Sequence, residues 1–187
     1  MRRHLFKFCV SVVFVCGAAQ AKDDFESVRC GPDIPQALAG KRISDEPVVK
    51  IEGRHKELGL RDLGGDEISD RLNSSSWSIC GKEYMLLLNA HGVVQDALAL
   101  PPHSRTSPEF GAGTCRANGR EVAVLVVAVL DNKAARSNSL HYSPRDETLL
   151  PAKAAWKIDE KAGKFVAFSS NGLSCPRSGI ITDDGGP

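Results

Sequence analysis

Hydrophobic and polar residues alternate over short stretches of this chain, and turn residues separate the stretches. Trp156 and Ile158 alternate with polar neighbours before a turn at residues 161–163, and KFVAFS follows it. EYMLLLN and VVQDALAL flank a second turn at residues 89–92, which contains Asn and Gly. Alternation on both sides of such a turn is typical of a β-hairpin. The pattern therefore predicts a chain built mostly of antiparallel hairpins.

Three further segments have patterns of their own. EVAVLVVAVLD, at residues 121–131, is long, apolar and rich in β-branched residues, which predicts a central strand buried on both faces. Alternation in residues 48–54 predicts a short half-buried strand. Asp66 is a candidate N-cap, and Ile68 and Leu72 are four residues apart, so a short helix is expected there. The predicted fold is mainly β: a small antiparallel sandwich or partly open barrel of hairpins with one short helix.

Proline, glycine and polar residues indicate where the chain is irregular or forms loops. Residues 22–46 contain several prolines and glycines and are expected to form an irregular N-terminal arm. Residues 47–187 are expected to form a single β-rich domain. Two long loops, at 101–118 and 132–152, are predicted within it from their polar, aperiodic sequence. Loops of this length on a β scaffold often carry binding residues.

The N-terminus has the three parts of a secretory signal peptide. A basic start, an apolar segment and a small-x-small site lie at residues 2–7, 8–15 and 19–21. Cleavage is expected after Ala21, which predicts a periplasmic or secreted protein. The paired arginines at positions 2 and 3 also fit a twin-arginine signal, so general and twin-arginine export both remain open. No later apolar stretch reaches the length of a membrane span.

Export to an oxidising compartment favours disulfide bonds between the cysteines. Six are present, and two of them lie in the predicted signal peptide. An even number in an exported chain predicts two disulfides, in any of three pairings. Zinc sites usually contain two closely spaced cysteines, and no such pair is present here, which favours disulfides over a metal site. The four cysteines that remain are Cys30, Cys80, Cys115 and Cys175.

Charge is nearly balanced. The chain carries 24 Lys and Arg against 23 Asp and Glu, and residues 1–21 account for three of the basic side chains and none of the acidic ones. The chain without that segment therefore has a formal charge of −2. No long basic run is present, so neither nucleic acid nor an anionic membrane is expected as a partner. No phosphate-binding or dinucleotide motif is found, and no cofactor is expected.

One cysteine, one histidine and one acid lie close together in sequence, as in a cysteine nucleophile with its base. A hairpin places His91 at its tip, about ten residues from Cys80 at roughly 3.3 Å per residue, which separates the two side chains. An exposed thiol in an exported protein also oxidises readily. Cys80, His91 and Asp96 are therefore not expected to form a catalytic site, and a serine-hydrolase motif is absent.

These observations favour a non-enzymatic binding or inhibitor-type protein that acts through loops on a β scaffold. Its partner is expected to be another protein or a cell-wall component. An exported hydrolase with a dispersed site, including the loop histidines and carboxylates, is the alternative. A small-ligand carrier with an apolar cavity is a third hypothesis. The candidate binding residues, chosen for their place in the loops, are His103, Phe110, His141 and Tyr142.

Overall fold

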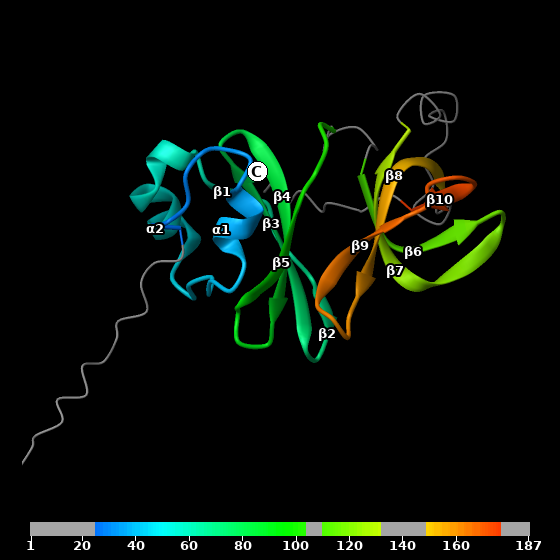
Figure 1. Ribbon diagram of the computed structural model, residues 1–187, viewed down its shortest axis with the longest axis horizontal. Helices are drawn as coiled ribbons and strands as arrows, with labels where there is room; N and C mark the ends of the chain where they lie inside the picture. Colours follow the sequence, from blue (N-terminus) through cyan, green and yellow to red (C-terminus); the bar gives the residue numbers. More distant parts are fainter. Residues whose placement is uncertain (1–24, 104–109, 132–148, 177–187) are drawn as a thin grey trace, which may run out of the picture.

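Strands dominate the computed structural model of the chain, which describes residues 25–103, 110–131 and 149–176 (Figure 1). The helical elements are α1 (Ile34–Leu38), α2 (Val48–Arg54) and the short 3-10 turn η1 (Lys56–Leu58). The strands are β1 (Arg61–Asp62), β2 (Glu67–Ser69), β3 (Leu72–Ile79), β4 (Lys82–Asn89), β5 (Val94–Ala99), β6 (Phe110–Ala117), β7 (Arg120–Leu130), β8 (Leu150–Asp159), β9 (Lys164–Phe168) and β10 (Leu173–Cys175). No described helix is long and apolar enough to cross a membrane.

Two antiparallel sheets account for all these strands. In the first, the order is β1-β3-β4-β5, and β2 also pairs with β3. In the second, the order is β10-β6-β7-β8-β9, and β10 also pairs with β8, so four strands form a partly closed barrel. The predicted mainly β fold of antiparallel hairpins is confirmed, with two helices instead of one.

Strand β4 separates two hydrophobic cores. Tyr84 and Leu86 point to one face, where they pack with residues of α1, α2 and the N-terminal arm. Met85 and Leu87 point to the opposite face and pack with Val127 of the barrel. Figure 1 shows the helices on one side of the first sheet and the barrel on the other. Because successive side chains of a strand alternate between faces, one strand supports both layers.

The hydroxyl of Tyr84 belongs to the core on the helical side. Its side chain is 2% exposed. Burial penalises the charged phenolate, and this desolvation raises the pKa of Tyr84 above its ordinary value.

A third cluster fills the barrel. Val126, Ala128 and Leu130 of β7 point inward together with Leu150 of β8 and Leu173 of β10. Cys115 and Cys175 are fully buried in this cluster and form a disulfide. The bond joins β6 to β10 and fixes the closure of the barrel.

The N-terminal arm is tied to the first sheet. Cys30 forms the second disulfide with Cys80, which lies in the turn between β3 and β4. Phe25 and Val28 are buried in the core beneath the arm. The arm is less irregular than predicted, because residues 34–38 form helix α1. The prediction of two disulfides among the four cysteines is confirmed. The structure also shows which of the three possible pairings is formed.

Helix α2 replaces the strand predicted for residues 48–54, and that prediction is wrong. Val49, which the strand pattern placed inward, is 72% exposed. The buried residues are instead Ile51, His55 and Leu58, at spacings of four and three. This is the period of a helix face, and it continues through η1.

The helix predicted from Asp66 is also wrong, because the segment forms the β2–β3 hairpin. Asp70 and Arg71 make the turn, and Ser69 pairs with Leu72. Ile68 and Leu72 both pack in the cluster between the sheets. Two apolar residues four apart fit one face of a helix, but they fit the two sides of a short hairpin equally well.

Residues 110–117, predicted to belong to the loop at 101–118, form strand β6. A Cβ atom added at Gly111 would lie 2.3 Å from the carbonyl oxygen of Pro176. The glycine therefore allows close approach of the segment that follows β10, and it does not mark a loop. Residues 150–152 of the second predicted loop likewise belong to β8, and residues 132–148 lie outside the described part of the chain.

Strand β7 is central, as predicted, but only its second half is buried. Residues 126–130 are buried, whereas Glu121, Ala123 and Val124 are exposed. The expectation of burial on both faces is therefore wrong for the first half of the strand.

Candidate functional site: a cleft between the two sheets

The two sheets pack at one end and separate at the other, where they leave a cleft of about 880 Å³. Leu87 and Ile158 belong to the apolar cluster that closes the packed end. At the open end, the same face of the first sheet carries Ser78 and Glu83, which are cross-strand partners on β3 and β4. Ala154 and Trp156 of β8 form the opposite wall. Polar residues replace apolar ones where the sheets diverge, and the volume is typical of a ligand-binding pocket.

A buried histidine and a carboxylate meet in this cleft. His103 Nε2 lies 3.2 Å from Glu83 Oε2, with the two side chains 2% and 12% exposed. His103 Nδ1 lies 2.9 Å from the carbonyl oxygen of Pro101. Both ring nitrogens therefore face oxygen acceptors, and each can donate only when it carries a proton. The close approach of His103 to Glu83 holds the chain after β5 against β4.

The remaining lining combines an apolar wall with a basic rim. Leu63, Leu100 and Pro102 line the cleft together with the ring of Trp156, which is partly buried. Arg61 of β1 and Lys82 of β4 also line it, and both are exposed. Glu83 is engaged with His103, so the two exposed cations give the rim a positive character. Such a cleft suits a ligand with an apolar part and a negative charge.

The predicted binding residues have different positions. His103 lines the cleft. Phe110 is the first residue of β6. His141 and Tyr142 lie outside the described residues. In the part of the chain that the structure describes, no group of three or more His, Cys, Asp or Glu side chains is arranged to hold a metal ion.

The cysteine, histidine and acid considered as a catalytic set have three separate places in the fold. Cys80 is oxidised in a disulfide at the β3–β4 turn. His91 is exposed in the turn at the other end of β4. Asp96 Oδ2 accepts a hydrogen bond of 2.9 Å from the backbone N–H of Phe165, and so links β5 to β9. Cys80 and Asp96 therefore each link separate parts of the fold, and His91 lies in the turn between β4 and β5.

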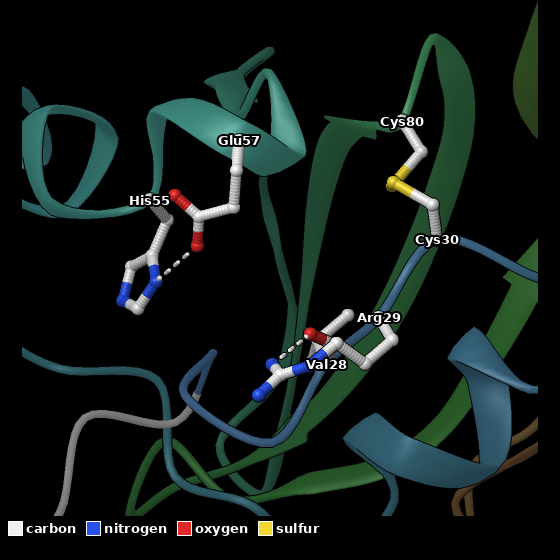
Figure 2. Close-up of a disulfide and its surroundings, with 6 residues drawn as sticks. All are labelled: Val28, Arg29, Cys30, His55, Glu57 and Cys80. Atoms are coloured by element: carbon white, nitrogen blue, oxygen red, sulfur yellow. Dashed lines mark hydrogen bonds and ion pairs between the residues drawn. A yellow bond between two sulfur atoms is a disulfide. The ribbon is translucent and has the colours of Figure 1, made fainter.

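A second hollow, of about 490 Å³, lies beside the N-terminal arm. His55 lines it, with its ring centre 5.9 Å from that of Phe25. Its Nδ1 lies 3.7 Å from Glu57 Oε1 (Figure 2). Arg29 donates to the carbonyl oxygen of Val28 at 2.7 Å. Arg54, which also lines the hollow, pairs with Glu46 at 2.6 Å. These contacts hold the arm in place, and they make the hollow a weaker candidate than the cleft.

Sequence patterns missed most of the cleft. Glu83 had a detectable signal, because it lies on the strand face that also carries Met85 and Leu87, where a charge is unexpected. The alternation that includes Trp156 predicts a strand but does not distinguish a core position from the cleft wall, where the residue lies. Arg61 had no signal, because its place in the cleft depends on the pairing of β1 with β3.

Searches of protein-family models, of curated proteins and of solved structures found no match to this chain. The two disulfides are typical of a protein in an oxidising, exported environment.

Proposed function

We propose that this chain is an exported, non-enzymatic binding protein and that its binding site is the cleft between the sheets. The signal-peptide pattern of residues 1–21 and the two disulfides support export. The observation that carries the binding role is the cleft itself, with its apolar wall, its basic rim and the buried pair of His103 and Glu83. The ligand that fits this chemistry is an acidic segment of another protein, and an anionic cell-wall component is the alternative source.

The contacts of His103 favour binding over hydrolysis. Ser78, Glu83 and His103 all line the cleft, so a serine nucleophile with a histidine base deserves a test. A general base needs a ring nitrogen within reach of the proton that it takes. Here Nδ1 faces Pro101 and Nε2 faces Glu83, so neither ring nitrogen is directed at Ser78.

A fragment screen by NMR tests the binding proposal. The library contains aromatic carboxylates and their neutral amides, and the full disulfide-bonded chain is the target. We expect hits among the carboxylates, with shift changes at the amides of the cleft residues. Hits that cluster elsewhere, or equal binding of the neutral amides, contradict the proposal.

A matched pair of substitutions separates the cleft from the rest of the barrel. Ala154→Trp places a large ring in the cleft and is expected to abolish fragment binding. Ala162→Trp adds the same ring at an exposed position of the turn between β8 and β9, outside the cleft lining, and is expected to leave binding unchanged. The alternative function, hydrolysis, is tested with the His103→Ala variant. Any hydrolytic activity of the native chain should be lost in this variant if His103 belongs to its site.

A further inference from the structure

The first half of β7 has an unpaired edge. β7 pairs with β6 from Val129 to Leu125 and again at Glu121 and Arg120. Its pairing with β8 begins only at Val126, which lies opposite Lys157. On the β8 side, residues 121–125 therefore pair with no other described strand. Figure 1 shows the β6–β7 hairpin extending away from β8 and β9.

Two contacts hold the strands apart. The register shifts between Thr114 and Arg116 of β6, where Cys115 alone lies opposite residues 122–124 of β7, so the bulge is on β7. Cys115 is bonded to Cys175. A bulge bends a strand and increases its twist, which directs the hairpin away from β8. On the other side, the β8–β9 hairpin is held to the first sheet by the hydrogen bond from Phe165 N–H to Asp96. The gap is therefore part of the fold.

The gap is a hollow of about 440 Å³ whose edge is apolar. Val122, Ala123 and Val124 follow one another along β7, and Val124 is 39% exposed. Free edges are normally protected by charged residues, proline, a bulge, short length or a covering segment. Residues 121–125 carry the bulge of β7, but Glu121 is their only charged residue and they contain no proline. The apolar edge therefore remains open to another strand beside the bulge.

The charges around the hollow are mostly negative. Glu121, Asp159 and Glu160 line it, with Lys157 as the only basic residue among the described lining residues. Within the described part of the chain, none of the three carboxylates is engaged in an ion pair. Their charges remain available to a basic partner.

We propose that this edge binds an extended, basic peptide segment of a partner protein, which adds a strand to β7 at residues 121–125. Backbone hydrogen bonds to the free N–H and C=O groups supply affinity, as in other cases of strand addition. Alternate apolar side chains of the peptide pack on Val122 and Val124. Its basic side chains on the other face meet the carboxylates of the hollow. This site is distinct from the cleft and does not depend on the function proposed for it.

Three synthetic peptides with blocked ends test the proposal on the full disulfide-bonded chain. The probe alternates valine and lysine, the second peptide has the same sequence with alternate amides N-methylated, and the third replaces lysine by glutamate. We expect the probe to slow hydrogen exchange at the amides of residues 121–125. Because N-methylation removes backbone donors, it should weaken binding by about tenfold or more. The glutamate peptide should bind more weakly than the probe, because it repels the carboxylates.

A matched pair of variants locates the binding. Val124→Lys places a charge on the edge and is expected to weaken probe binding by about tenfold or more. Val166→Lys is the control, because Val166 is similarly exposed, at 38%, but lies on β9. Equal binding of the N-methylated peptide, or equal loss in both variants, overturns the proposal. A dimer that Val124→Lys dissociates also overturns it, and assigns the edge to a second copy of the chain.

Discussion

Replacing Glu83 by glutamine removes the charge that faces His103 Nε2 at 3.2 Å and keeps the shape of the side chain. At this distance two unit charges attract by about 5 kcal/mol in an effective dielectric of roughly 20. Much of that energy offsets the desolvation of both groups. Removing the carboxylate breaks a buried pair, so we expect Glu83→Gln to lower the free energy of unfolding by about 3 kcal/mol.

A double-mutant cycle isolates the pair from the other contacts of each residue. His103→Asn is the second variant, because its amide nitrogen lies near the position of Nδ1 and can still donate to Pro101. We expect a coupling energy of about 2 kcal/mol from guanidinium unfolding of the four proteins. Additive effects, with a coupling below about 0.5 kcal/mol, refute a stabilising interaction between Glu83 and His103.

Three further predictions concern the scaffold. Leu87→Ala empties a fully buried position between the two sheets and should lower the free energy of chemical unfolding by about 3 kcal/mol. Burial raises the pKa of Tyr84, so the unfolded chain ionises first and stability should fall as pH rises above about 10. The Tyr84→Phe variant should lack this part of the fall, and identical alkaline stability curves would contradict the assignment. Replacing Cys115 and Cys175 together by serine removes a bond with a sequence separation of 60, so the free energy of unfolding should fall by about 4 kcal/mol in thermal or chemical unfolding. Peptide mapping of this variant without reduction should still recover the Cys30–Cys80 bond.

Local sequence predicted the hairpins well, because the information for them lies within a few residues. Asn89 is an example: its side-chain oxygen accepts hydrogen bonds from the backbone N–H groups of His91 and Val93, at 2.9 and 3.0 Å. Such contacts close the turn between β4 and β5 without help from distant segments. The β8–β9 hairpin was predicted in the same way, from alternation on both sides of a turn.

Elements that depend on distant partners could not be predicted. The glycine-rich strand β6 lacks periodicity, and it is a strand because it pairs with both β7 and β10. Helix α2 contains two valines and a glycine, which are weak helix formers, and it is stabilised where Ile51 packs in the core beneath the arm. In both cases tertiary contacts override the local preference.

The candidate site was predictable only in part. His103 was chosen for its place in a polar loop, whereas the buried position beside Glu83 follows from the path of the chain after β5. The cleft itself is formed by two sheets that diverge, and no pattern within either sheet encodes the space between them. Glu83 is a charged residue on a strand face that otherwise carries apolar side chains, and residues that break the local pattern in this way are common at functional sites.

The order of the two disulfides has a consequence for maturation if the chain is exported unfolded by the general secretory route. Cys30 pairs with Cys80 and Cys115 with Cys175, so each bond joins consecutive cysteines of the chain that follows the predicted signal peptide. A chain that emerges N-terminus first presents each cysteine with its native partner before the next one appears. An oxidant acting during emergence therefore produces the native bonds directly, without later exchange. Non-native pairs arise only when oxidation is delayed until Cys115 has emerged, and an isomerase is then needed to correct them.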